Sequence, residues 1–224
     1  MRTKGFVWMS LLVCLGLLAA GCQQAGQKPQ PASSAGPQQV QPAAATQPKP
    51  SEPVAQATAE PQVQRRFELR VNCGAYEAFK DKLGRTWVAD QELEPGKTWG
   101  AVDGMTVERT WAEIAGTDIP QVYQYERYSM ESYIFNVPNG TYTVRLHFAE
   151  TYEGIGGPGE RVFSVSIQGQ MVLKDLDLYK TCGGAYKALV KEYKGVEVKD
   201  GKLVIGFTPN IENPEINGIE IIAE

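Results

Sequence analysis

The chain contains few of the residues from which metal sites and nucleophilic catalytic centres are usually built. His147 is its single histidine, and its four cysteines, Cys14, Cys22, Cys73 and Cys182, include no Cys-x-x-Cys pair. Zinc sites are built mainly from clustered cysteines and histidines, so the sequence predicts no metal and no cofactor. Cys73 and Cys182 could form a disulfide in an oxidising compartment, or they could remain two small buried thiols.

Residues 23–64 contain no aromatic residue. Gln, Pro and Ala contribute 11, 8 and 9 residues, which together fill 28 of the 42 positions. Side chains of this kind bury too little apolar surface to offset the entropy lost on ordering. The composition therefore predicts a disordered tether that is partly polyproline-like.

An excess of positive charge is also absent. The whole chain has a formal net charge of -4, and residues 65–224 contain 18 basic and 24 acidic residues, a net charge of -6. This balance argues against nucleic acid as the main partner. The same residues hold all ten tyrosines and are numerous enough for one domain.

The first 22 residues have the organisation of a secretory signal. Arg2 and Lys4 precede an apolar run over residues 6–20, and Gly21 precedes Cys22. The segment resembles the lipobox of bacterial lipoproteins, which implies lipidation of Cys22, a membrane anchor and a location in the cell envelope. Gln23 resembles residues that favour the outer membrane in a host with two membranes. The alternative is an ordinary cleaved signal in which Cys22 has no role.

Alternating apolar residues dominate the remaining sequence. In residues 141–149, Tyr142, Val144, Leu146 and Phe148 occupy every second position, which predicts a strand with one buried face. A similar run over residues 133–137 precedes an Asn-Gly pair, so we expect these two runs to form a hairpin. Short strands at regular spacing, with almost no helical periodicity, predict an all-β fold, a jelly-roll-like β-sandwich.

Two other stretches are candidates for functional sites. Residues 75–105 have the composition of long irregular loops, and Trp87 and Trp99 within them suggest a functional role. Asp175 and Asp177 lie on one side of an expected strand, where they could bind calcium or serve as acid and base. Contacts with backbone amides or lysines are the alternative for these two aspartates.

Six segments give the chain a resemblance to the malectin domain family over residues 67–222. They occur in the family's order and spacing, and they are RVNCG (70–74), YQYERY (123–128), LHFAETY (146–152), RVFSVSIQG (161–169), VLKDLDLY (172–179) and NPEINGIEI (213–221). The resemblance implies a jelly-roll-like β-sandwich that binds carbohydrate through aromatic residues and an acid on loops at one end.

The family's sugar-binding positions are carried over one at a time. Tyr128 and Tyr152 match family tyrosines, and Trp99 stands where the family has a tyrosine before a glycine. Glu153 replaces a second aromatic residue, and Glu212 replaces an aspartate before Asn-Pro. The departures from the family at Trp99, Glu153 and Glu212 affect which sugar is expected to bind, and they leave sugar binding itself as the expectation.

The resemblance to the lipobox and the resemblance to the malectin domain family together imply a lipid-anchored protein that binds a glycan without cleaving it. A protein-interaction or envelope-assembly module on the same scaffold is the alternative, because a fold does not determine a function. A glycoside hydrolase would need two carboxylates facing each other across a cleft, and no spacing selects such a pair. We expect His147 to be a hydrogen-bonded strand residue and Glu150 to support the loop that follows it.

Overall fold

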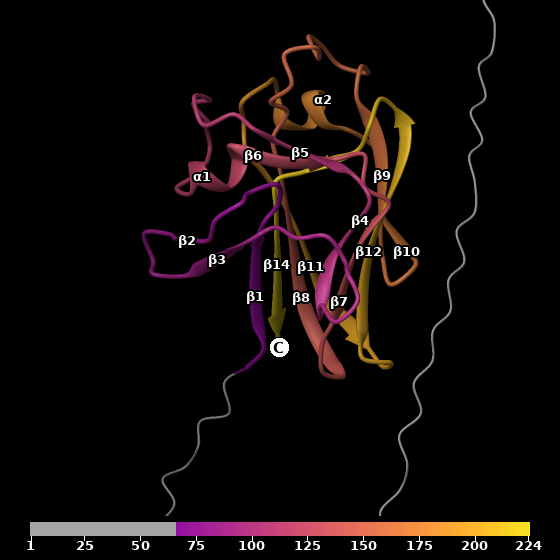
Figure 1. The fold of residues 1–224 in the computed structure, drawn as a ribbon. Coiled ribbons are helices and arrows are strands. Elements are labelled where there is room, and N and C mark those ends of the chain that lie inside the picture. Colours follow the sequence, from indigo (N-terminus) through magenta and orange to yellow (C-terminus); the bar gives the residue numbers. More distant parts are fainter. Residues whose placement is uncertain (1–65) are drawn as a thin grey trace, which may run out of the picture. The chain divides into compact units, whose positions relative to one another are not determined.

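The computed structural model describes residues 66–224 (Figure 1). The predicted signal segment, the predicted lipidation site at Cys22 and the predicted tether lie outside the described residues. Within residues 66–224, no helix is both long and apolar enough to cross a membrane.

The described residues form an all-β sandwich whose two main sheets pack face to face. The first sheet has the strand order β11-β8-β14-β1-β3-β2, and the second has the order β10-β9-β12-β7-β4. The strands of the first sheet are β1 (Glu68–Asn72), β2 (Phe79–Lys80), β3 (Thr86–Ala89), β8 (Gly140–Phe148), β11 (Leu189–Val198) and β14 (Gly218–Ala223). Those of the second are β4 (Trp99–Val102), β7 (Ser132–Asn136), β9 (Val162–Ile167), β10 (Gln170–Asp177) and β12 (Lys202–Ile211).

A third, smaller sheet covers one end of the sandwich. It has the order β13-β6-β5, with β5 at Met105–Glu108, β6 at Tyr125–Tyr128 and β13 at Glu215–Ile216. Two short helices, α1 (Pro120–Tyr123) and α2 (Leu178–Cys182), lie at the same end, which is the upper end in Figure 1. The chain end at residue 224 lies at the opposite end of the sandwich.

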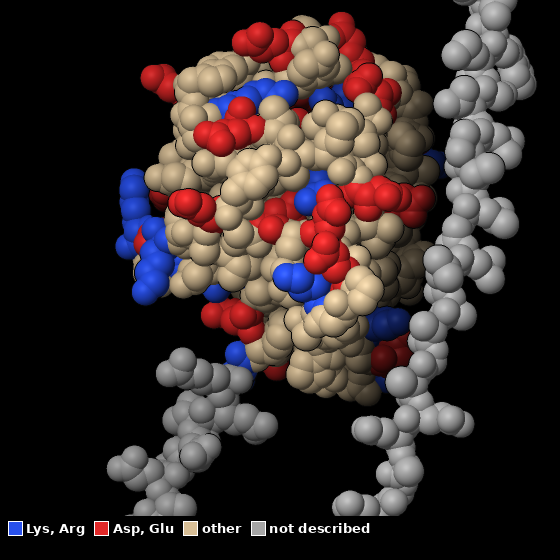
Figure 2. Space-filling view, viewed as in Figure 1, with Lys and Arg blue, Asp and Glu red and all other residues tan. Residues whose placement is uncertain are grey.

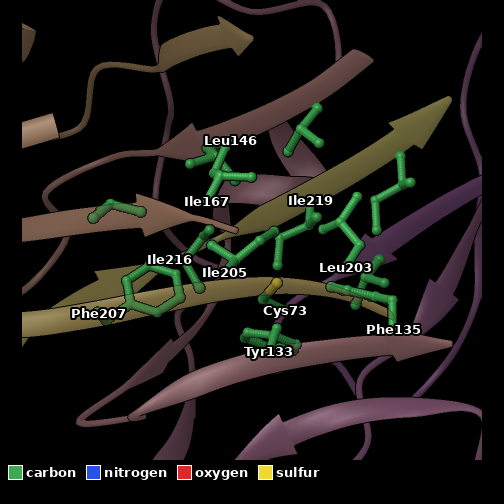
Figure 3. Close-up of a cluster of buried hydrophobic side chains, with 14 of the residues drawn as sticks. Cys73, Tyr133, Phe135, Leu146, Ile167, Leu203, Ile205, Phe207, Ile216 and Ile219 are labelled. Atoms are coloured by element: carbon green, nitrogen blue, oxygen red, sulfur yellow. The ribbon is translucent and has the colours of Figure 1, made fainter. Parts of the chain in front are cut away.

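The core fills the space between the two main sheets. Leu146 and Ile219 come from the first sheet, whereas Phe135, Leu203 and Ile205 come from the second, and these side chains meet in the interior (Figure 3). All five are fully buried. The alternating pattern therefore correctly predicted the all-β sandwich and the buried face of β8.

The predicted hairpin between residues 133–137 and 142–149 is wrong. β7 pairs with β4 and β12 in the second sheet, while β8 pairs with β11 and β14 in the first. The turn at Asn139 instead carries the chain from one sheet to the other, and its side-chain oxygen accepts a hydrogen bond from Gly201 N at 2.8 Å. Alternation predicts which face of a strand is buried, but it does not tell a hairpin partner from a strand across the core.

The predicted irregular region, residues 75–105, contains the three strands β2, β3 and β4 and the first residue of β5. Trp87 on β3 is fully buried and belongs to a second apolar cluster with Val122 and Tyr123. Its indole Nε1 donates to Asp81 Oδ2 at 3.2 Å. Trp87 is thus a core residue, and the functional role expected for it from a loop position is wrong.

The two cysteines beyond residue 65 are free thiols in this structure. Cys73 is fully buried in the main core, and burial raises the pKa of its thiol well above the ordinary value. Cys182 is half-buried at the end of α2, and burial raises the pKa of its thiol to about 12. Of the two alternatives for these residues, the structure has the two thiols.

Asp175 and Asp177 have separate partners. Asp177 caps α2, because its Oδ1 accepts from Lys180 N at 3.0 Å, and its Oδ2 accepts from Gly159 N at 2.9 Å. Asp175 sits at a bulge of β10 with a positive φ of 49°, and its Oδ1 accepts from Asn210 Nδ2 at 2.9 Å. Their contacts are those of structural residues.

Candidate functional site

A cleft of about 210 Å³ lies at the loop end of the sandwich, and we call it the Tyr152 cleft. Three of the predicted site residues, Tyr128, Tyr152 and Glu212, line it although they are far apart in the sequence. The remaining lining residues are Val107, Arg109, Glu126 and Arg161. Small-molecule pockets commonly measure about 300–1,000 Å³, so this cleft is small.

The strand ends of three elements bring these residues together. Tyr128 ends β6, where it pairs with Met105 of β5 on one side and Glu215 of β13 on the other. Tyr152 belongs to the loop that follows β8, and Glu212 follows the last residue of β12. Loops placed at one end of a rigid sandwich are a common location for binding residues.

The ring of Tyr152 lies against the backbone of its own loop. Its side chain is 46% exposed, and a Cβ added at Gly154 would lie 2.5 Å from two of its ring atoms. Only glycine leaves room for the ring in this position. The guanidinium carbon of Arg109 lies over the Tyr152 ring, 6.0 Å from its centroid, at the limit of a cation–π contact.

Buried ion pairs form the floor of the cleft. Arg109 Nη1 lies 2.9 Å from Glu126 Oε2, which also accepts from Thr151 Oγ1 at 2.7 Å. Arg161 Nε donates to Glu150 Oε2 at 2.7 Å. Each guanidinium is therefore compensated by a carboxylate, so the floor has little net charge.

The two arginines also hold the loops that carry the aromatic and acidic residues. Arg161 Nη1 donates to Asn213 O at 2.7 Å, next to Glu212, and Arg109 Nη1 donates to Thr151 Oγ1 at 3.3 Å, next to Tyr152. Glu150 Oε1 accepts from Tyr152 N at 3.0 Å, which confirms that Glu150 supports its loop. Burial raises the pKa of the Glu150 carboxyl, while Arg161 acts in the opposite direction.

Glu215 lies beneath this floor without a partner. It is fully buried, and neither carboxylate oxygen accepts or donates a hydrogen bond within residues 66–224. Burial raises the pKa of the Glu215 carboxyl well above its ordinary value, and the nearby charges of Glu126 and Glu150 add to this effect. The neutral, protonated acid is the form that such surroundings favour.

The other predicted site residues do not line the Tyr152 cleft. Trp99 on β4 is half-buried and stacks on Phe135, with ring centroids 5.8 Å apart and an angle of 14° between the planes. Glu153 is exposed on the loop after Tyr152. Glu212, which does line the cleft, has a positive φ of 58°, and its Oε1 accepts from Asn213 Nδ2 at 2.9 Å.

Sequence reasoning missed Arg109, Glu126, Arg161 and Glu215. Glu126, Arg161 and Glu215 lie within the segments YQYERY, RVFSVSIQG and NPEINGIEI, so their membership of these segments was the available signal, whereas Arg109 lies in none of them. His147 was predicted correctly, because Nδ1 contacts Tyr123 Oη at 2.8 Å and Nε2 contacts Glu220 Oε1 at 3.1 Å. It is a hydrogen-bonded strand residue away from the cleft.

The profile of the Malectin domain family matches residues 67–219. Receptor-like protein 4 of Arabidopsis thaliana is 49% identical over 85 residues, which are 38% of this chain and 13% of that protein. Malectin of Mus musculus is 31% identical over 117 residues, which are 46% of this chain and 40% of that protein. The chain thus spans less than half the length of either relative.

Solved structures share the fold. The β-glucuronidase of Bacteroides uniformis superposes with a TM-score of 0.63 and 28% identity, over 70% of this chain and 18% of that chain. The plant receptor-like kinase FER superposes with a TM-score of 0.58 and 23% identity, over 69% of this chain and 48% of that one. The second likeness concerns the fold alone.

Proposed function

The chain belongs to the malectin domain family, whose profile covers residues 67–219, and on this basis we propose that its domain binds a neutral glycan without cleaving it. The observation that supports the proposal best is the convergence of Tyr128, Tyr152 and Glu212 on one cleft. Two of these three match family tyrosines, and the third is the acid before Asn-Pro.

The chemistry of the cleft suits a sugar ring. The C–H groups of a pyranose pack on an aromatic face, and its hydroxyls need fixed donors and acceptors. Tyr128 and Tyr152 offer both a ring and a hydroxyl, and the carboxylate of Glu212 can accept from two adjacent sugar hydroxyls. The small volume of the cleft favours a single ring or the end of a chain.

The charge balance of the floor favours a neutral sugar over a uronic acid. Arg109 and Arg161 would be natural partners for a carboxylate, but Glu126 and Glu150 already neutralise them at 2.9 and 2.7 Å. An anionic sugar would have to compete with these buried pairs. We therefore expect uronic acids to bind more weakly than the matching neutral sugars.

The lining carboxylates also support a role without cleavage. A glycosidase needs one carboxyl as general acid and a second as nucleophile or base. Glu126 and Glu212 are the carboxylates that line the cleft, and Glu126 is engaged by Arg109 and Thr151. Of these two carboxylates, only that of Glu212 is exposed, so the cleft does not present the pair that a glycosidase needs.

We also propose that Cys22 is lipidated and that the domain faces the cell envelope on a tether formed by residues 23–64. The lipobox-like sequence before Cys22 and the composition of the tether support this arrangement. A tether of this composition would let the domain reach glycans away from the membrane surface.

Titration of the full chain with saccharides selected on a glycan array tests the binding function. Tyr152→Ala and Tyr128→Ala should each weaken binding by about 1–3 kcal/mol, as expected for a well-packed aromatic contact. Met171→Ala is the matched control, because Met171 is 58% exposed on β10 and lies outside the cleft. No binding to any saccharide at millimolar concentration, or equal binding by all variants, would favour the interaction-module alternative.

A further inference from the structure

A second cleft, of about 460 Å³, adjoins the first at Tyr128, and we call it the Tyr76 cleft. Of the residues in the described domain, Tyr128 alone lines both. The Tyr76 cleft lies between the loop that follows β1 and the start of β5, and its lining includes Tyr76, Glu92, Met105, Thr106, Arg127 and Tyr128. None of the side chains Tyr76, Glu92 and Thr106 takes part in the site described above.

The apolar surface of the Tyr76 cleft is exposed yet held in place. Tyr76 is 71% exposed and Met105 is 57% exposed. The hydroxyl of Tyr76 lies 3.0 Å from Thr106 Oγ1, and the hydroxyl of Tyr128 donates to Met105 Sδ at 3.7 Å. Single exposed apolar residues are common on protein surfaces, but here two tyrosines and a methionine line one cleft.

Short loop-to-strand contacts fix the floor of the Tyr76 cleft. A Cβ at Gly74 would lie 2.3 Å from Glu126 O, and a Cβ at Gly104 would lie 2.7 Å from Tyr128 O. Asp90 Oδ2 accepts from Gly74 N and from Arg127 Nε, both at 2.7 Å. The floor is therefore pre-formed, which lowers the entropy that a ligand must overcome on binding.

The polar groups of the Tyr76 cleft match those of the Tyr152 cleft. Arg127 is compensated by Asp90, as Arg109 and Arg161 are compensated by glutamates. Glu92 is exposed, and its carboxylate has no hydrogen-bond or ion-pair partner among the side chains of the described residues. The Tyr76 cleft thus repeats the combination of aromatic rings, a neutralised arginine and an acceptor carboxylate.

From this repetition we propose that the Tyr76 cleft is a second sugar subsite and that the ligand is a neutral oligosaccharide lying across Tyr128. This inference rests on the proposed function, since it extends the same binding site. The smaller Tyr152 cleft takes the terminal ring, and the larger Tyr76 cleft takes the sugar units that follow it. Tyr128, at the junction, contacts the ligand on both sides.

The test measures binding of the full chain against ligand length. A glycan array identifies the best-binding neutral saccharide, and its terminal monosaccharide and the matching di- and trisaccharide are then titrated into the parent chain, Tyr76→Ala and Tyr152→Ala. We expect affinity to rise about tenfold or more with the added units, and Tyr76→Ala to remove this gain while leaving the affinity for the shortest ligand within about twofold. Tyr152→Ala should weaken binding at every length.

Two further variants separate stacking from folding. Tyr76→Phe keeps the ring and loses the contact with Thr106, so it should retain most of the gain with length. Met171→Ala should behave like the parent chain, and an unchanged thermal midpoint shows that Tyr76→Ala is folded.

The possible failures are distinguishable. Affinity that is independent of length and insensitive to Tyr76→Ala, but lost in Tyr152→Ala, overturns the second subsite and leaves the proposed function intact. Absence of saccharide binding in the parent chain overturns both.

Discussion

Replacing Glu215 by glutamine should remove a pH-dependent loss of stability. The Glu215 carboxyl is fully buried and unpartnered within the described residues, and burial raises its pKa well above the ordinary value of 4.5. Between pH 4.5 and that raised pKa the folded protein binds a proton that the unfolded chain has released. Unfolding is then favoured as pH rises, so Glu215 contributes less stability at pH 7 than at pH 5.

The size of the effect follows from the pH interval. Each pH unit in this window changes the free energy of unfolding by about 1.4 kcal/mol, which gives an upper bound of about 3.5 kcal/mol between pH 4.5 and 7. Glu215→Gln keeps the shape and cannot ionise. The glutamine amide is a buried, unpaired donor that costs about 1–3 kcal/mol at every pH. The informative quantity is therefore the change of stability with pH, not the stability at one pH.

The assay is urea denaturation of the parent chain and Glu215→Gln at half-unit intervals from pH 5 to pH 8. The stability of Glu215→Gln relative to the parent should increase steadily with pH, at up to about 1.4 kcal/mol per unit. Glu150 is unchanged in both proteins, so most of its contribution cancels. Glu131→Gln, at an exposed glutamate, is the control and should show no such trend. Parallel pH profiles for the parent and Glu215→Gln would refute the reasoning.

Three other changes test the loop and the segment before residue 66. Gly154→Ala should weaken saccharide binding about as much as Tyr152→Ala, because the added Cβ would lie 2.5 Å from the Tyr152 ring and displace it; unaltered affinity would show that the ring position is unimportant. Cys22→Ser should release the protein from membranes into the soluble fraction, since stable anchoring depends on acyl chains; continued membrane association would contradict lipidation. Deleting residues 23–64 should leave the thermal midpoint within a few degrees of the parent value, whereas a larger drop in differential scanning calorimetry would mean that this segment packs on the domain.

The alternating pattern was sufficient to predict the fold class but not the pairing of strands. It placed Tyr142, Val144, Leu146 and Phe148 on a buried face, and all four are buried. It could not show that β7 lies across the core from β8, because both arrangements bury the same residues. Trp99 illustrates the same limit, since its stacking on Phe135 depends on the pairing of β4 with β7.

Three of the predicted site residues were brought together, whereas the charges beneath them were not predicted. Tyr128, Tyr152 and Glu212 meet in the Tyr152 cleft. Arg109 comes from a segment without a recognisable pattern, and its partner Glu126 is 17 residues away in the sequence. A charge in a sequence has the same appearance whether it is solvated or buried in a pair, so only the fold reveals its role.

Acidic and basic side chains are intermixed with uncharged surface on the face seen in Figure 2. Pairs on such a surface contribute little to stability, typically about 0–1 kcal/mol. The pairs of Arg161 with Glu150 and of Arg127 with Asp90 differ, because all four side chains are almost completely buried. The small contribution typical of exposed ion pairs therefore does not apply to these two buried pairs.

Buried ion pairs are an expensive way to stabilise a domain, because the loss of hydration offsets much of the attraction between the charges. Apolar side chains of similar volume would serve a core as well. What they could not do is donate to chosen backbone and hydroxyl oxygens, as Arg161 does to Asn213 O and Arg109 does to Thr151 Oγ1. These bonds fix the residues beside Glu212 and Tyr152, on loops that leave different sheets. We infer that the arginines hold these two loops in one arrangement. Burial raises the pKa of the Glu215 carboxyl and so favours its neutral form, which places no third negative charge beside the two pairs.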